Sequence, residues 1–265
     1  MHHDLILRAI AALTLSFAPM SLTAQSESEF ARIEMLTGWQ MENGNRMAAV
    51  RVALAPGWHT YWRAPGEAGI PPRFFWSGSQ NVAAVRYHWP IPQVYEQNGM
   101  TFIGYEDELV LPIEIIPRTS GDIRLSGVME LGVCDDICMP LSAPLSATFD
   151  DSLDSADTAP IQKSLRSRPV AMTGVTCAAE PVSDGMRVKA TMSLPSLGIG
   201  EMAVIEHPDP QVWVAESTME RTGTDVSVTT EMVQPDAQPF AIERSSLIIT
   251  VLGNGQAYEA RGCRG

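Results

Sequence analysis

The stretch ELVLPIEIIPRTSGDIRLSGVMEL, residues 108–131, decides the predicted fold of this chain. Apolar and polar residues alternate in ELVLPIEI (108–115) and again in RLSGVMEL (124–131), with the turn-like segment PRTSGD between them. Because successive side chains of a β-strand point to opposite faces of a sheet, this alternation indicates half-buried antiparallel strands. Long amphipathic helices are absent from the sequence pattern elsewhere, so the predicted fold class is all-β.

Strand-like runs separated by proline and glycine continue on both sides of this stretch. Besides residues 108–131 they include MAAVRVALAP (47–56), the extension FIGYED (102–107) and LSATF (145–149). Short runs bounded by turn residues are typical of a β-sandwich. We therefore expect a first sandwich, with long loops, over residues 25–149.

The strand pattern resumes after Pro169 in seven short runs. Seven strands in about 95 residues are what an immunoglobulin-like β-sandwich requires, so we predict a second sandwich over residues 170–265. The sequence Gly253–Gly255 marks a hairpin between the last two runs. The runs are MTGVTCAAEPV, GMRVKATMSL, EMAVIEH, QVWVAEST, DVSVTTEMV, SLIITVLG and QAYEARGC.

Residues 150–169 separate the two predicted domains. The acidic, low-complexity piece DDSLDSADTAP is followed by PIQKSLRSRP (160–169), which has the composition of a short helix. That helix lacks an apolar face wide enough for a core helix, so the whole segment is interpreted as a linker.

The N-terminus has the pattern of a secretory signal. Arg8 precedes the apolar run AIAALTLSFAPMSLTA, and small residues end that run at Ala24. This predicts a signal peptide over residues 1–24 and an exported, periplasmic protein. No later stretch is long and apolar enough to span a bilayer, so no membrane span is expected after signal cleavage.

The charge of the chain excludes several function classes. Eighteen basic and 31 acidic residues give a net charge of −13 at neutral pH. Such a surface repels phosphate backbones and anionic lipids, so no nucleic-acid partner is expected. The sequence also has no G-x-S-x-G, H-E-x-x-H or phosphate-binding loop, which argues against a hydrolase.

The chain has four cysteines, Cys134, Cys138, Cys177 and Cys263. Cysteines of an exported chain are usually bridged, and four allow three connectivities. We favour 134–138 with 177–263, because each bond then lies within one predicted domain. The bond 177–263 would close a loop of about 87 residues and stabilise the fold by roughly 4–5 kcal/mol in the chain-entropy model, which favours a structural role.

The pair Cys134/Cys138 is of a different kind. Its short loop contributes only about 2 kcal/mol in the same model. Such a bond opens and closes without unfolding the domain around it, which favours a redox role. Asp135 and Asp136 between the thiols disfavour a thiolate by charge repulsion, so the pair is expected to act as a reductant or relay rather than as a donor of disulfides.

Two other functions use the same thiols. Copper(I) prefers soft sulfur ligands, and Met129 and Met139 flank the pair, so a copper-binding or copper-tolerance module is one alternative. A structural two-sandwich protein with inert disulfides is the other. Zinc is disfavoured because His59, His88 and His207 lack ligand spacing to the thiols. No cofactor and no resident metal are predicted.

The segments around the thiols resemble a known family. Four segments of the first domain, in the order in which they occur along the chain, are similar to the periplasmic N-terminal domain of DsbD-type thiol:disulfide interchange proteins. The similarity is greatest to the branch of the suppressor-of-copper-sensitivity B proteins. The segments VIEHPDPQVWV (204–214) and ARGC (260–263) also resemble the second immunoglobulin-like domain of that branch. The segments of the first domain are GWHTYWRAPGEAGIPPRFFW (57–76), WPIPQVYEQNG (89–99), GYEDELVLPIEI (104–115) and VCDDICMP (133–140).

The resemblance implies a bacterial periplasmic protein that passes electrons through one cysteine pair. Its electrons would come from a membrane electron conductor or a thioredoxin-like protein, and its clients would be periplasmic thiol proteins. By the same resemblance Cys138 forms the mixed disulfides, Tyr61 shields the bond, and the segment Trp89 to Tyr95 takes the place of the family's cap loop. Several relatives have more residues between their cysteines. Full-length relatives also continue into a membrane conductor, whereas this chain stops at Gly265 and would dock on a separate one.

The remaining aromatic residues of the segment 57–76 are expected to be sandwich core. His59 is expected to be a loop or surface residue, and Glu106 and Asp107 a solvated turn.

Overall fold

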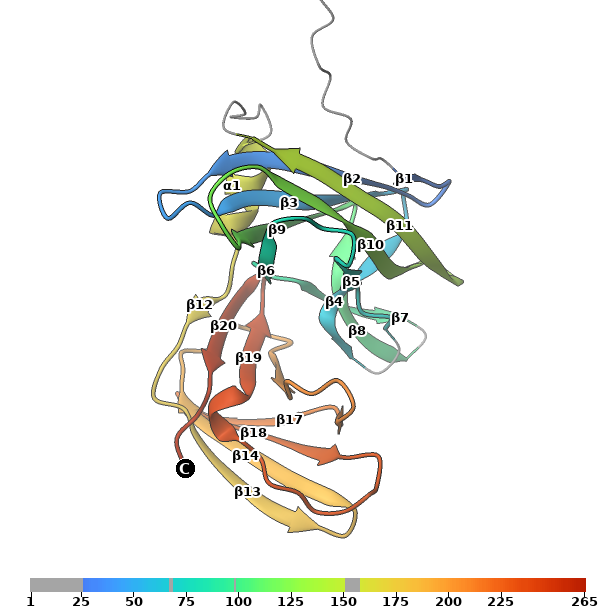
Figure 1. The fold of residues 1–265 in the computed structure, drawn as a ribbon. Helices are drawn as coiled ribbons and strands as arrows, with labels where there is room; N and C mark the ends of the chain where they lie inside the picture. The colour runs from blue at the N-terminus through green and yellow to red at the C-terminus, as the bar shows by residue number, and fades with distance from the viewer. Residues whose placement is uncertain (1–25, 67–68, 98, 151–157) are drawn as a thin grey trace, which may run out of the picture.

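Figure 1 shows a computed structural model in which two β-sandwiches are stacked end to end. The structure describes residues 26–66, 69–97, 99–150 and 158–265, so the predicted signal segment 1–24 lies outside the described residues. Apart from the helix α1 (Thr158–Arg166) and a short 3-10 turn (Arg244–Ser246), the described elements are all β-strands. The predicted all-β sandwich fold is confirmed.

Two sheets make up the first sandwich. One has the strand order β1-β2-β3-β9-β6 and the other the order β11-β10-β4-β8-β7, with β5 paired to β10. The strands of the first sheet are β1 (Ser26–Glu27), β2 (Ala31–Gln40), β3 (Arg46–Leu54), β9 (Glu108–Pro117) and β6 (Val82–Tyr87). Those of the second are β11 (Cys138–Phe149), β10 (Ile123–Cys134), β4 (His59–Gly66), β8 (Met100–Glu106), β7 (Gln93–Gln97) and β5 (Arg73–Phe75).

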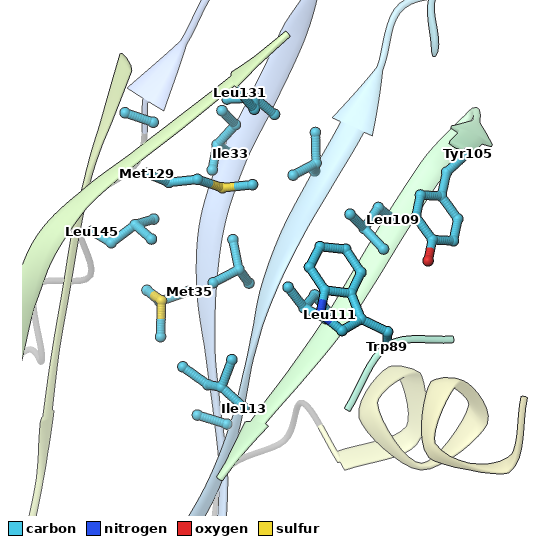
Figure 2. Close-up of a cluster of buried hydrophobic side chains, with 14 of the residues drawn as sticks. Ile33, Met35, Trp89, Tyr105, Leu109, Leu111, Ile113, Met129, Leu131 and Leu145 are labelled. Carbon is cyan, nitrogen blue, oxygen red and sulfur yellow. The ribbon is translucent and has the colours of Figure 1, made fainter. Parts of the chain in front are cut away.

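The stretch 108–131 supplies one strand to each of these sheets. Leu111 and Ile113 of β9 face Met129 and Leu131 of β10 across the main core of the sandwich (Figure 2). β9 pairs antiparallel with β3 and β6, whereas β10 pairs antiparallel with β11, β4 and β5. The alternation therefore predicts the two strands but not that they lie in opposite sheets.

β9 is buried on both faces rather than half-buried, because α1 covers its outer side (Figure 1). Ile161 of α1 is fully buried, and the Ser164 hydroxyl donates a hydrogen bond of 2.6 Å to the carbonyl of Val110. The segment predicted as a linker thus contains a helix that also packs on the first sandwich, a contact that the sequence pattern did not predict. Ile161 packs on an outward apolar patch of the sheet formed by Leu36, Met47, Ala49 and Val110, and Leu165 of α1 packs against the same cluster.

Two further sheets build the second sandwich, and each of the seven predicted runs contains a strand. The sheet orders are β12-β20-β19-β15 and β13-β14-β18-β16, with β17 paired to β18. Its strands are β12 (Val170–Ala171), β13 (Thr176–Val182), β14 (Gly185–Ser193), β15 (Met202–Glu206), β16 (Trp213–Val214), β17 (Thr218–Thr222), β18 (Asp225–Val233), β19 (Ile248–Gly253) and β20 (Gln256–Arg261).

The hairpin predicted at Gly253–Gly255 joins β19 to β20. Gly253 and Gln256 are register partners, and Asn254 and Gly255 between them have φ angles of 47° and 70°. Positive φ at both central residues matches the twist of a tight hairpin and favours asparagine followed by glycine.

Among the described residues, no sheet combines strands from the two halves of the chain. The halves nevertheless share apolar contacts, because Leu252 of β19 and Ala257 of β20 belong to the main core of the first sandwich. In Figure 1 these two strands rise from the second sandwich toward the first. No helix in the described part of the chain has the length and apolar character needed to cross a membrane.

Candidate functional site

Cys134 and Cys138 form a disulfide across the tip of the β10–β11 hairpin. Cys134 ends β10, Cys138 begins β11, and the two are register partners separated by a loop of Asp135, Asp136 and Ile137. On its other side Cys134 is the register partner of His59 in β4. The disulfide therefore lies at the end of the second sheet, where β10, β11 and β4 meet.

The two sulfur-bearing residues differ sharply in exposure. Cys134 is 1% exposed, whereas Cys138 and the three loop residues before it are exposed. Ile137 at the tip of the loop is 69% exposed. A thiol approaching from solvent therefore meets Cys138, with the buried Cys134 behind it.

The Tyr61 hydroxyl lies against both sulfurs. Its oxygen is 2.9 Å from Sγ of Cys134, to which it donates a hydrogen bond, and 3.4 Å from Sγ of Cys138. The tyrosine is 3% exposed, and burial raises the pKa of its phenol. The hydroxyl is thus neutral at physiological pH and can donate to a developing thiolate. The sequence prediction for Tyr61 put it at the disulfide, and that is where the structure places it.

An aromatic wall of His59, Phe102 and Tyr95 surrounds Tyr61 and Cys134. The rings of His59 and Phe102 stack at 4.3 Å between centroids, and those of Tyr95 and Phe102 stack at 5.1 Å. His59 also meets Tyr61 edge to face at 5.4 Å. Phe102, Tyr61 and Cys134 form one buried cluster, and Tyr95 packs against it.

The expectation that His59 lies on a loop or at the surface is wrong, because the residue begins β4 and is 5% exposed. Burial lowers the pKa of its imidazole, and the nearby charge of Asp135 opposes that shift only in part. The ring is therefore a neutral member of the wall. Burial, with help from the charge of Glu106, likewise raises the pKa of Tyr95 to about 12.

Sequence reasoning missed His59 and Phe102 as parts of this site. The sequence does carry a signal for the face that they share, since His59 and Tyr61 are two residues apart on one strand and Phe102 and Gly104 are two apart on another. The pairing of those strands, with Tyr61 opposite Gly104, is a long-range feature that no local pattern reveals.

Only the end of the segment Trp89 to Tyr95 reaches the disulfide. Tyr95 packs against the buried cluster there. Trp89 instead belongs to the main core, together with Leu111 and Tyr105 (Figure 2). The structure thus separates two residues that we expected to act together as cover.

Cys177 and Cys263 form the second disulfide, between β13 and the segment that follows β20. Cys177 is 4% exposed, and its backbone N–H donates a hydrogen bond of 2.6 Å to the carbonyl of Arg264. The bond fixes the chain beyond β20 to β13. Among the described residues, no pair of stacked aromatic rings like that of His59 and Phe102 involves a residue next to this disulfide in the sequence.

The two methionines that flank the cysteine pair in the sequence both pack in the core. Met129 is fully buried in the main core, and Met139 packs against it. In the described ranges, no three side chains of His, Cys, Asp or Glu gather closely enough to hold a metal ion.

Comparison with known proteins gives two matches. Residues 32–150 match the family described as "Thiol:disulfide interchange protein DsbD, N-terminal". The fold is similar to that in the crystal structure of the N-terminal periplasmic domain of ScsB from Proteus mirabilis, with a TM-score of 0.63 and 23% sequence identity over 90% of this chain and 94% of that one. A comparison with curated proteins gave no match.

Proposed function

Residues 32–150 of this chain match the family of DsbD N-terminal domains, and on that premise we propose that the protein is a periplasmic thiol–disulfide exchange protein. It relays electrons through the Cys134/Cys138 pair between partner thiol proteins. One observation carries the proposal, namely an exposed Cys138 bonded to a buried Cys134 whose sulfur accepts a hydrogen bond from Tyr61.

Electrons enter in two exchanges. The thiolate of a reduced partner attacks Sγ of Cys138, a mixed disulfide forms, and Sγ of Cys134 leaves as a thiolate. The Tyr61 hydroxyl stabilises that leaving sulfur. The second cysteine thiolate of the partner then attacks the partner's first sulfur, which is bonded to Cys138 in the mixed disulfide, and Cys138 leaves as a thiolate. The partner leaves with a disulfide, and the Cys134/Cys138 pair has gained two electrons.

Electrons leave by the reverse sequence. The Cys138 thiolate attacks the disulfide of a client, and one client sulfur leaves as a thiolate. Cys134 then attacks Cys138 in the mixed disulfide, which restores the intramolecular bond and releases the client with two thiols. The buried position of Cys134, next to Cys138 and away from solvent, suits it to this resolving step.

The location and partners follow from the same proposal. The signal pattern at residues 1–24 supports export to the periplasm. A membrane electron conductor or a thioredoxin-like protein would supply the electrons, and a periplasmic thiol protein would be the client. Asp135 and Asp136 are exposed beside Cys138, so negative charge surrounds the attacking sulfur and favours a role as reductant or relay.

Trapping with single-cysteine variants tests the proposal. Cys134→Ser leaves the exposed Cys138 without a resolving partner. It should accumulate mixed disulfides with a thioredoxin-fold protein that keeps one active-site cysteine, activated as a mixed disulfide with thionitrobenzoate, because the Cys138 thiolate attacks that disulfide and thionitrobenzoate leaves. Cys138→Ser should not. The double variant Cys177→Ser/Cys263→Ser is the matched control and should cycle as the parent does. Equal trapping by both single variants would contradict the assignment of Cys138 as the attacking and Cys134 as the resolving cysteine. Failure of both variants to trap a partner would support an inert structural disulfide.

A further inference from the structure

The strand β4 carries both His59 and Tyr61 to the disulfide, yet little regular pairing holds it beyond that point. Its ladder with β8 runs from His59 to Tyr61, is then interrupted by a register shift, and resumes only at Gly66. Its pairing with β10 is confined to His59 and Thr60. The segment that follows Tyr61 therefore needs another support to fix the position of the tyrosine.

Arg63 supplies that support by reaching into the second sandwich. Its guanidinium makes a two-pronged contact with the carboxylate of Glu206, with Nε–Oε2 at 2.9 Å and Nη2–Oε1 at 2.8 Å. Nη2 also donates to Oε2 of Glu259 at 2.6 Å. Glu206 ends β15 and Glu259 lies on β20, so two strands of one sheet hold the same arginine.

This ion cluster is sheltered from water. The side chains of Arg63, Glu206 and Glu259 are only 15%, 16% and 13% exposed. The guanidinium also lies 4.2 Å from the ring centroid of Trp62, which is fully buried. A planar guanidinium held at two prongs has a fixed direction as well as a fixed distance, and a buried charge that lost its partners would be strongly destabilised.

Apolar contacts make the support rigid. Met202 and Val204 of β15, and Leu252 and Ala257 of β19 and β20, pack against the main core of the first sandwich. The two glutamates thus lie on strands that pack against that core. Glu259 receives a further contact of 2.9 Å from Arg261.

We propose that Arg63 is a positioning residue. Through Arg63 the second sandwich supports β4, the strand that carries Tyr61 to the disulfide. By holding β4 just beyond Tyr61, the Arg63–Glu206–Glu259 cluster keeps the Tyr61 hydroxyl on Sγ of Cys134. The second sandwich thereby sets the rate at which the Cys134–Cys138 disulfide exchanges. This inference rests on the proposed function only in taking that disulfide as the reactive one.

A double-mutant cycle between Arg63 and Tyr61 tests the inference. The readout is the rate at which dithiothreitol reduces Cys134–Cys138 in the full chain, followed by alkylation and peptide mapping. Arg63→Met should slow this reduction on the order of tenfold, because small misplacements of a reacting group have large effects on rate. In the Tyr61→Phe background the same change should have less than about a twofold effect, because the hydroxyl through which Arg63 acts is already gone.

The control is Arg261→Gln, which removes a contact to the same Glu259 from an arginine that is 69% exposed and should leave the rate unchanged. If Arg63→Met does not fold, Glu206→Gln, which keeps the Glu259 contact, takes its place in the cycle. Equal slowing in both Tyr61 backgrounds, or no slowing in either, would overturn the inference. Because dithiothreitol needs no protein partner, these outcomes are separate from a failure of the trapping experiment, which would overturn the proposed function.

Discussion

The hydroxyl of Tyr61 lies 2.9 Å from Sγ of Cys134, on the buried side of the disulfide. One residue thus contributes two separable things to this site. Its oxygen can stabilise charge on the sulfur that leaves, and its ring is predicted to shield the bond. Two substitutions at this position separate the effects.

Tyr61→Phe removes the oxygen and keeps the ring. We expect reduction of Cys134–Cys138 to slow by about tenfold, since a hydrogen bond to a charged group is worth roughly 1.5–3 kcal/mol and only part of that acts in the transition state. Stopped-flow or quench kinetics with dithiothreitol measure the rate. An unchanged rate would mean that the hydroxyl does not assist the departure of Cys134.

Tyr61→Ala removes both the oxygen and the ring. Glutathione should then reduce the disulfide faster than it does in the parent and much faster than in Tyr61→Phe, because the cover over the sulfurs is gone. Reaction with a docked protein partner should gain less, since docking rather than the ring sets the approach of its thiol to Cys138. If glutathione reacts with Tyr61→Ala and Tyr61→Phe at the same rate, the ring does not shield the bond.

The strand pattern of this chain could be predicted from the sequence because alternation is a local property. Each run of the second half contains a strand, and β9 and β10 lie where the alternation in residues 108–131 predicts strands. The packing of the helix α1 on the sheet could not be predicted, because it depends on long-range contacts. Ile161 docks into a patch that only forms when β2, β3 and β9 are side by side, and residues far apart in the sequence supply that patch.

The candidate site follows the same division. The cysteine pair and Tyr61 could be predicted from motif and resemblance, and the structure brings them into contact. His59 could not, because its burial depends on the pairing of β4 with β10 and on stacking against Phe102. Trp89 was assigned to the cover because the segment Trp89 to Tyr95 falls where the resembling family has its cap loop, whereas in this chain the segment leads from the main core to the disulfide.

The two disulfides should open in a fixed order. Cys138 is exposed, whereas Cys177 is 4% exposed and its neighbours are tied by backbone hydrogen bonds to Arg264. Mild reductant should therefore open Cys134–Cys138 first, and the free energy of unfolding should fall by no more than about 2 kcal/mol. Loss of Cys177–Cys263 should cost roughly 4–5 kcal/mol.

Partial reduction, alkylation and peptide mapping give the order of opening, and urea unfolding of the partly reduced protein gives the stability. The serine variants of each pair are the matched controls. Opening of the long-range bond first, or any peptide joining Cys134 to Cys177, would contradict this division of labour.

The last prediction concerns pH and the buried His59. Burial lowers the pKa of its imidazole below the ordinary value near 6.5, with Asp135 opposing the shift. The unfolded chain therefore binds the proton more readily than the folded one. Stability is fully present above about pH 6.5 and is lost as the pH falls from there toward the folded pKa. Burial and the charge of Arg168 lower the pKa of His88 as well, with Glu114 opposing, so its contribution has the same sign.

His59→Phe keeps an aromatic ring that can stack on Phe102 and removes the titrating group. The free energy of unfolding of the parent should decrease between pH 7.5 and pH 5, and that of His59→Phe should decrease less, with the remaining slope due to groups such as His88. Urea unfolding at intervals of half a pH unit, with the disulfides kept oxidised, measures both curves. Parallel curves for the two proteins would show that His59 takes up its proton as easily in the folded state as in the unfolded one. In that case the aromatic wall beside Cys134 would be open to water on the side of β4, and Tyr61 alone would separate the buried sulfur from solvent.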